Sequence, residues 1–335
     1  MAKTPVNTLA GEIALSVVVP CYNECESVAE LYRRVGDACR EAVGDAYEMV
    51  LVIDGATDGT REAIFDLARR DGHVVGIDLA RNYGHQIALS AGLEFCRGRR
   101  VLVLDADLQD PPELLRSMMA RMDEGYDVVY GQRVKRDGES LFKRSSAAIF
   151  YRVLRKMVDV DIAADTGDFR LMSRRAVDQL NAMPERYRFV RGMVSWIGLR
   201  QTAFPYERHP RFAGTTHYPL GAMIRFAIDA ITGFSTVPLR IATYLGFAGA
   251  LVGVFFMGWT VYSYVTGITV QGWTTLMAPI LILGSTQLLV LGVIGEYLGR
   301  LYMQSKNRPL YIIDEIRCRE SAARYLAEPT VSSVA

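Results

Sequence analysis

Residues 14–130 alternate short apolar runs with longer segments in which apolar positions recur every three or four residues. A short apolar run bounded by turn formers predicts a buried strand, and the three-to-four spacing predicts an amphipathic helix. The predicted strands, in chain order, are 16–20, 48–53, 74–79, 101–104 and 126–130. The predicted helices are 27–43, 60–70, 87–96 and 113–124. This alternation predicts an α/β domain with a mainly parallel, Rossmann-like sheet, for which we set the limits 1–218.

A second pattern begins late in the chain, where residues 241–295 contain no Asp, Glu, Lys, Arg or His. A helix needs about 20 apolar residues to cross the hydrocarbon core of a bilayer. The more polar segment 266–273 divides the stretch into two candidate spans, 241–265 and 274–297. We therefore predict a transmembrane hairpin within 239–298. The alternative is a buried helical hairpin of a soluble protein, but both runs exceed the usual length of a core helix.

The charges on either side of this hairpin predict its orientation. Arg225 and Arg240 precede the first span, Arg300 and Lys306 follow the second, and the connecting loop is uncharged. Because Lys and Arg are concentrated on the cytoplasmic side of membranes, both flanks are expected to be cytoplasmic. The residues 299–335 are then a cytoplasmic C-terminal tail.

Two segments outside the hairpin have amphipathic patterns. Residues 141–158 place apolar positions on one helical face and basic positions largely opposite, which suits an anionic membrane surface. Packing on the predicted α/β domain is the alternative for this helix. Residues 219–238 predict a juxtamembrane helix that leads into the first span.

Composition excludes some partners. The 335 residues carry a net charge of +1 with a pI near 7.6, which argues against a nucleic-acid binder. The five cysteines show no Cys-x-x-Cys pair and no zinc spacing, which indicates reduced thiols in the cytosol. The first 15 residues lack the apolar core expected of a signal peptide.

Candidate chemistry begins at the run Val-Leu-Val-Leu-Asp-Ala-Asp of residues 101–107. Pro111 and Pro112 cannot continue a sheet ladder, so Asp105 and Asp107 are expected at the carboxyl end of a buried strand. Ligands of open α/β sheets bind at that edge. Two carboxylates there suit a hard divalent cation that also binds phosphate oxygens. Solvated turn aspartates are the alternative for an isolated Asp-x-Asp.

Polar groups also follow the other predicted strands, as Pro-Cys-Tyr-Asn-Glu at 20–24, Asp-Gly-Ala-Thr-Asp-Gly at 54–59 and Arg-Asn-Tyr-Gly-His-Gln at 81–86. Together with Asp-Ala-Asp-Leu-Gln-Asp-Pro-Pro-Glu and Thr-Gly-Asp-Phe-Arg-Leu-Met at 166–172, they resemble glycosyltransferase family 2. More narrowly, the chain is similar to the polyprenyl-phosphate glycosyltransferases with a C-terminal membrane hairpin. The first crossover has no Gly-x-Gly-x-x-Gly, so a dinucleotide dehydrogenase is disfavoured.

The resemblance implies a GT-A fold and a donor site for a nucleotide diphosphate sugar. By motif, Asp54 is expected to bind the base, and Asp107, with Asp105, is expected to hold Mg²⁺ or Mn²⁺ at the diphosphate. The complete donor set is Pro20, Tyr22, Glu24, Asp54, Asn82, His85, Gln86, Asp105, Ala106 and Asp107. Ile53 and Ala56 depart from the family pattern, which leaves the preferred base open.

The same resemblance implies the acceptor site. Asp168 matches the family's proposed catalytic acid/base position, and its alternative role is an N-cap or a partner of Arg170. A phosphate monoester has a second pKa of about 6 and is largely dianionic at neutral pH, so Asp168 is expected mainly to orient the attacking oxygen. Arg208, Arg211 and His217 are expected to bind the acceptor phosphate. His217 replaces a usual lysine, which predicts pH-sensitive acceptor binding.

The resemblance therefore implies inverting transfer of a sugar, with UDP-glucose the first choice, to a polyprenyl phosphate at the cytoplasmic face of the bacterial inner membrane. It also implies a homo-oligomer, with a tetramer one possibility. Two alternatives remain: a processive family 2 polysaccharide synthase and a catalytically idle membrane scaffold of the same fold. The chain lacks the Gln-x-x-Arg-Trp motif of processive synthases, and its intact acidic and basic residues speak against the scaffold.

Overall fold

The structure, a computed structural model, describes residues 13–134, 166–208, 235–267 and 273–319. The chain divides into two compact units. One comprises Met1–Ala148, Val160–Tyr218 and Pro309–Ala335, and the other comprises Ile149–Asp159 and Pro219–Arg308. The expected helix at 141–158 and almost all of the one at 219–238 lie outside the described residues.

The first unit is built on an eight-stranded sheet in the order β7-β5-β6-β4-β1-β2-β3-β8. The strands are β1 (Leu15–Cys21), β2 (Tyr47–Ile53), β3 (Val74–Leu79), β4 (Arg100–Val103), β5 (Val128–Arg133), β6 (Thr166–Ser173), β7 (Gln201–Tyr206) and β8 (Ile313–Arg317). The central strands β4, β1, β2 and β3 are parallel, as predicted. β6 and β8 run antiparallel to their neighbours, so the whole sheet is mixed.

Helices cover both faces of the sheet. They are α1 (Cys25–Val43), α2 (Thr60–Arg70), α3 (His85–Phe95), α4 (Leu115–Asp123), α6 (Arg174–Asn181) and α7 (Val190–Trp196), with a 3-10 turn, η1, at Pro112–Leu114. Val17 and Val19 of β1 pack in one core with residues of α1 and α2. Val18 faces the other way, where Gly92 lets α3 approach closely, since a Cβ there would overlap the Val18 side chain. The continuous apolar runs are therefore strands buried on both faces.

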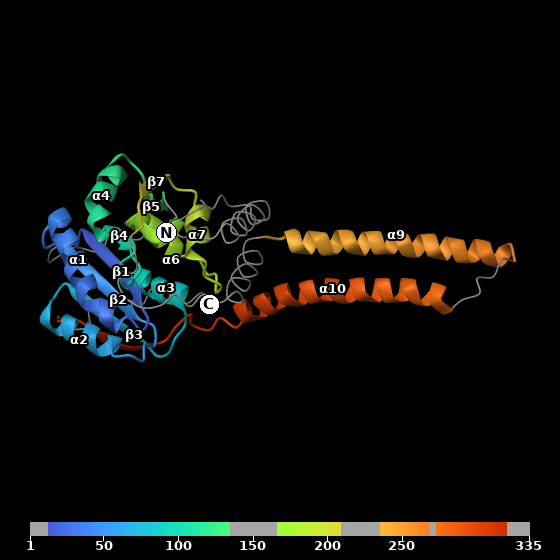
Figure 1. Cartoon of the computed structure of the whole chain (residues 1–335), viewed down its shortest axis with the longest axis horizontal. Helices are drawn as coiled ribbons and strands as arrows, with labels where there is room; N and C mark the ends of the chain where they lie inside the picture. Colours follow the sequence, from blue (N-terminus) through green and yellow to red (C-terminus); the bar gives the residue numbers. More distant parts are fainter. Residues whose placement is uncertain (1–12, 135–165, 209–234, 268–272, 320–335) are drawn as a thin grey trace, which may run out of the picture. The chain divides into compact units, whose positions relative to one another are not determined.

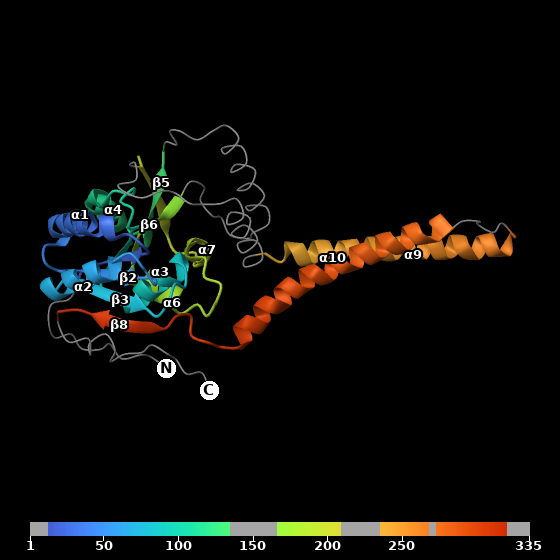
Figure 2. The ribbon, with the colours of Figure 1, turned by 60° about the horizontal axis from the view of Figure 1, so that its bottom comes forward.

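The strand β8 was not predicted, because residues 299–335 were expected to be a tail. Instead β8 pairs antiparallel with the edge strand β3, and Ala80 N donates to Ile312 O at 2.9 Å. The pairing satisfies backbone groups that the edge of β3 would otherwise expose. Figure 2 shows β8 alongside β3 at the margin of the sheet.

The second unit contains two long helices, α9 (Val237–Val265) and α10 (Trp273–Ser305), which contact each other and run side by side in Figure 1. The apolar segments Val237–Ser263 and Ile282–Ser305 are long enough to cross a membrane, and almost none of their residues are buried within the protein. Both helices extend beyond the predicted spans, since α9 begins at Val237 and α10 continues to Ser305. Near the end of α10, Glu296 and Arg300 form an ion pair at 2.9 Å. Tyr297 Oη also donates to Ser235 O at 2.6 Å.

Candidate active site

The acidic loop begins where β4 ends, as predicted. Asp105 follows Val103 by two residues, and Asp107 and Asp110 are 6% and 0% exposed. Between them Leu108 has a φ of 56°, which is unusual for a bulky side chain, and its side chain is anchored in the core. This strained turn holds three carboxylates on one short loop.

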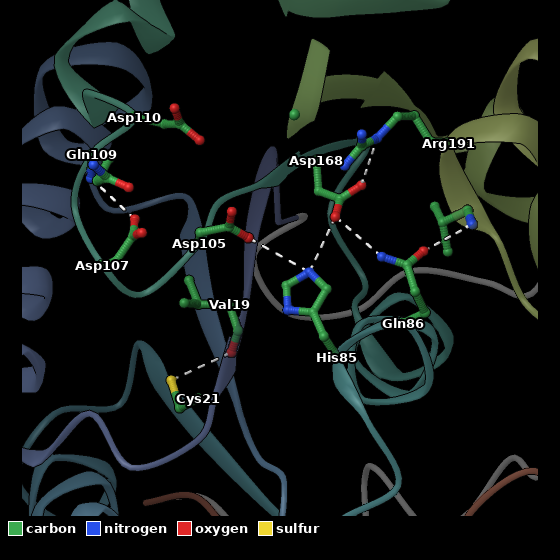
Figure 3. A network of polar contacts seen from close by, with 12 residues as sticks. Val19, Cys21, His85, Gln86, Asp105, Asp107, Gln109, Asp110, Asp168 and Arg191 are labelled. Carbon is green, nitrogen blue, oxygen red and sulfur yellow. Dashed lines mark hydrogen bonds and ion pairs between the residues drawn. The ribbon is translucent and has the colours of Figure 1, made fainter. Parts of the chain in front are cut away.

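Register brings Asp168 to the same place. β4 and β6 are antiparallel with Val103 opposite Arg170, so Asp105, two residues beyond Val103, comes opposite Asp168. His85, in the first turn of α3, lies between the two carboxylates (Figure 3). Its Nε2 is 3.1 Å from Asp168 Oδ2 and 3.6 Å from Asp105 Oδ1. Helix α3 begins two residues earlier than predicted, and this extra length places His85 on the helix.

Asp168 is 5% exposed and lies among donors and cations. Gln86 Nε2 donates to its Oδ2 at 3.1 Å, and Arg191 Nε lies 3.4 Å and the Arg170 guanidinium 3.7 Å from its Oδ1. Burial acts to raise the pKa of Asp168, but the charges of Arg191, His85 and Arg170 hold it well below its usual range. Asp168 is therefore ionised and a weak proton acceptor.

His85 and Asp105 respond to each other's charge. Loss of water acts to lower the pKa of His85, but the hydrogen bond with Asp168 and the charges of Asp105 and Asp168 outweigh it and raise that pKa to about 9. Burial, together with the neighbouring carboxylates, raises the pKa of Asp105 to about 6 although His85 opposes the shift. The imidazole is thus positively charged at neutral pH.

Arg208 is the described member of the expected acceptor set, and it lies beside the acidic loop. Its Nη2 is 3.9 Å from Asp107 Oδ2 and its Nε is 3.7 Å from Asp110 Oδ1. Asp110 also accepts a short hydrogen bond from the Tyr206 hydroxyl. Arg208 is thereby held at the edge that carries Asp107. Arg211 and His217 lie outside the described residues.

Of the remaining predicted donor residues, Pro20 lies at the end of β1, Ala106 lies on the acidic loop, and the others lie on the loops after β1, β2 and β3. Both Asp54 oxygens accept backbone hydrogen bonds, from Tyr83 N at 2.7 Å and Gly84 N at 2.9 Å. Glu24 N donates to Thr60 Oγ1 at 2.9 Å, which ties the first loop to α2. The other four members differ in exposure: Pro20 and Ala106 are buried, Tyr22 is 50% exposed and Asn82 is exposed.

Gly55 makes the contact between two of these loops possible. Its φ is 64°, a left-handed conformation that favours glycine. A Cβ at this position would lie 2.6 Å from the carbonyl carbon of Arg81 and would overlap the backbone nitrogen of Asn82. Asp54 and Gly55 together therefore fix the loop after β3 against the loop after β2.

Comparison with known proteins places this geometry in a family. A model described as Glycosyl transferase family 2 matches residues 16–180, and one described as GtrB C-terminal hairpin matches residues 237–301. The uncharacterized glycosyltransferase YkcC of Bacillus subtilis (strain 168) is 44% identical over 92% of this chain and 95% of its own length. The chain belongs to glycosyltransferase family 2.

Other similar proteins carry more specific names. The prophage bactoprenol glucosyl transferase homolog of Escherichia coli (strain K12) is 37% identical, covering 90% of this chain and 99% of that protein. Among solved structures, mannosyl-3-phosphoglycerate synthase from Rubrobacter xylanophilus aligns with a TM-score of 0.44 and 16% identity, over 65% of this chain and 72% of that chain.

The acidic edge of this glycosyltransferase fits a divalent cation. Asp105 Oδ1 is buried and accepts no hydrogen bond within the described residues, and burial favours a positive ligand for such an oxygen. One ligand atom from each of His85, Asp105 and Asp168 lies within 4.8 Å of the others, but the protonated imidazole of His85 has no free lone pair for a cation, so the donors are carboxylates. Hard carboxylate oxygens match the preference of Mg²⁺ and Mn²⁺. The donor set therefore suits the cation expected from the sequence.

Two residues of this glycosyltransferase's site were absent from the predicted set. Arg191 lies in the first turn of α7 and contacts Asp168, and Asp110 lies between Tyr206 and Arg208. Arg191 is 23 residues from Asp168, and no local pattern distinguishes it from other arginines. Asp110 could have been included, because it belongs to the same loop as Asp105 and Asp107.

Proposed function

We propose that this glycosyltransferase transfers glucose from UDP-glucose to a polyprenyl phosphate, with inversion in a single displacement. The observation that carries the proposal is the similarity, over about nine-tenths of the chain, to proteins named bactoprenol glucosyl transferase, together with the matching C-terminal hairpin. The charged edge at Asp105, Asp107 and Arg208 supports it. A donor diphosphate and an acceptor phosphate both need compensating positive charge there.

The donor is proposed to lie along the carboxyl edge of β1, β2 and β4, with its diphosphate at the acidic loop. Asp105 and Asp107 would hold Mg²⁺ or Mn²⁺, which would supply charge neutralisation to the departing nucleoside diphosphate. Charge that develops only as the glycosidic bond breaks is stabilised more in the transition state than in the ground state. His85, positively charged at neutral pH, adds a cation from the chain itself.

The acceptor is proposed to be bound by Arg208, with Arg211 and His217 contributing from the segment that follows. A phosphate monoester is already largely dianionic at pH 7, so its oxygen can attack the anomeric carbon without a strong general base. The depressed pKa of Asp168 is compatible with this chemistry. Asp168 then acts by orienting Arg191 and His85 rather than by removing a proton.

The hairpin is proposed to anchor the enzyme in the bacterial inner membrane, with the catalytic unit and both termini cytoplasmic. The two apolar helices and the basic flanks support this topology. A lipid acceptor resides in the bilayer, so an anchored enzyme meets its phosphate at the headgroup level. The proposal includes self-association of the chain, with a tetramer as one form.

The test is turnover by the purified full chain with a short polyprenyl phosphate and a panel of UDP- and GDP-sugars. We expect UDP-glucose to give a glycosylated lipid and UDP, EDTA to abolish turnover, and Mg²⁺ or Mn²⁺ to restore it. Asp107→Asn should lower kcat about 100-fold, because a carboxylate ligand is lost. Asp123→Asn is the matched control, since Asp123 pairs with Arg100 on the surface away from this loop. Equal turnover by wild type and Asp107→Asn would refute the site.

A further inference from the structure

Gln86 connects two parts of the site through the two ends of one amide. Its Nε2 donates to Asp168 Oδ2 at 3.1 Å, and its Oε1 accepts from Val190 N at 2.9 Å (Figure 3). The chemistry fixes the orientation of the amide, because an ionised carboxylate can only accept and a backbone N–H can only donate. Both the donor and the acceptor of the Gln86 amide are therefore engaged in hydrogen bonds within the protein.

The partners of Gln86 are themselves joined. Val190 is the first residue of α7, and Arg191 follows it in the chain. The Nε of Arg191 lies 3.4 Å from Asp168 Oδ1, the oxygen that Gln86 does not contact. Gln86, Asp168, Arg191 and Val190 thus form a closed ring of three hydrogen bonds, two of them to the Asp168 carboxylate, and the peptide bond between Val190 and Arg191.

A second contact holds the segment that leads into α7. Ser90, one helical turn after Gln86, donates from its Oγ to Gln86 O and accepts from Arg188 Nε at 3.2 Å. Arg188 is 9% exposed and also donates to Met183 O and Leu180 O, which closes the end of α6. Helix α3 therefore makes two contacts with this segment, from Ser90 to Arg188 and from Gln86 to Val190. These contacts hold the start of α7 against α3 independently of the Arg191 ion pair.

We propose that Gln86 is a positioning residue, rather than a ligand of the donor, and that its amide sets the placement of Asp168 and Arg191 relative to each other. The activity readouts below rest on the proposed function. Loss of the amide leaves Asp168 Oδ2 its contact with His85 but removes the one with Gln86, and it also removes the hydrogen bond to Val190 N at the start of α7. A displacement of about 1 Å near the reacting groups can cost about 100-fold in rate. The residues proposed to bind the sugar nucleotide on the loops after β1 and β2 are not held in place by Gln86.

The first test separates kcat from KM. Gln86→Ala should lower kcat about 10-fold to 100-fold and change the donor KM by less than about twofold. A donor ligand would show the opposite pattern, with a raised donor KM. Gln201 is the matched control, because its amide donates to Val194 O in α7 at 2.8 Å but is not part of the ring. Gln201→Ala should keep the wild-type kcat.

The second test is a pH profile of Gln86→Glu. An ionised glutamate cannot donate to Asp168 and repels it, whereas a protonated glutamic acid has one donor and one acceptor, as glutamine does. The adjacent Asp168 carboxylate should raise the pKa of the new side chain above its ordinary value of about 4.3, against the opposing charges of His85 and Arg191, which also contact Asp168. The kcat of Gln86→Glu relative to wild type should therefore rise at least about fivefold as the pH falls from 8 to 6. Gln201→Glu should show no such rise.

A stability measurement keeps this proposal separate from the proposed function. The Tm of Gln86→Glu, compared with that of wild type, should recover as the pH falls from 8 to 6, with no substrate present. If wild type makes no glycosylated lipid but the Tm of Gln86→Glu still approaches that of wild type at pH 6, the substrate assignment fails and the positioning role of Gln86 is supported. A flat Tm difference, or a Gln86→Ala variant that changes only the donor KM, would overturn the positioning role.

Discussion

Arg61 donates from Nη2 to Glu315 Oε2 at 2.9 Å, although 254 residues separate the two in the chain. The same guanidinium donates from Nε to Asp78 on β3, whose side chain is only 8% exposed. Arg61 therefore joins α2 and β3 to the strand that the chain adds after the hairpin. The described part of the C-terminal segment is a structural component of the catalytic unit.

Arg61→Ala should destabilise the catalytic unit by about 2 kcal/mol, because it leaves the Asp78 carboxylate nearly buried without its cation. Glu315→Ala should cost less, about 0.5 kcal/mol, because Arg61 keeps Asp78 and the pair is partly exposed. Thermal unfolding of the purified chain measures both. The matched control is Arg69→Ala. Arg69 lies on the same helix, and its substitution removes an exposed ion pair with Asp66. Equal Tm values for Arg61→Ala and Arg69→Ala would contradict the role of Arg61.

Gly55→Ala should reduce both stability and donor affinity. The new Cβ meets the backbone at Arg81 and Asn82, and the left-handed φ adds strain, so we expect a cost of about 3 kcal/mol. The loop after β3 must then shift, which should raise the donor KM. Gly44→Ala is the control, since Gly44 has a φ of 62° with no atom within 4 Å of an added Cβ. It should cost about 1 kcal/mol and leave the donor KM unchanged. Identical effects of the two substitutions would show that the contact with the 81–82 backbone is unimportant.

The pairing of His85 should make stability depend on pH in a defined direction. Its folded pKa of about 9 lies above the ordinary value of 6.5, so its contribution is complete below pH 6.5 and is lost as the pH rises through 9. Because the side chain is 44% exposed, solvent screening limits the contribution to about 1 kcal/mol. The Tm difference between wild type and His85→Asn should therefore shrink between pH 6.5 and 9.5. A difference that stays constant across this range, or grows, would rule out a charged His85 between the carboxylates.

The proposed topology predicts which residues a membrane-impermeant thiol reagent reaches in intact cells. Thr266, just beyond α9, should lie outside the cytoplasm, and Ser305, at the end of α10, should lie inside it. Thr266→Cys should gain labelling over wild type in intact cells, and Ser305→Cys should gain it only after lysis. Mass spectrometry of the labelled peptide distinguishes these sites from the five native cysteines. The reverse labelling pattern would show that the hairpin has the opposite orientation in the membrane.

Much of the fold could be predicted because its signals are local. The helix at Thr60–Arg70 and the strand at Val74–Leu79 have the predicted limits, because the spacing of apolar residues within each segment indicates both the type of element and its buried positions. The start of α3 was missed by two residues because His85 and Gln86 are polar, and they are polar because they face the site. β8 was missed because a five-residue edge strand with three charged residues does not look like a buried strand.

The candidate site also has some features that local sequence predicts and others that depend on the tertiary structure. The sequence alone determined that Asp105 and Asp107 follow a buried strand and that two long apolar helices lie late in the chain, because each feature depends on neighbouring residues. Only the tertiary structure decided that Asp168 faces His85 across 83 residues and that Gln86 ties Asp168 to α7. Those contacts depend on the insertion of β6 beside β4 in an antiparallel register. Strand order and register arise from packing between distant segments, which no local periodicity records.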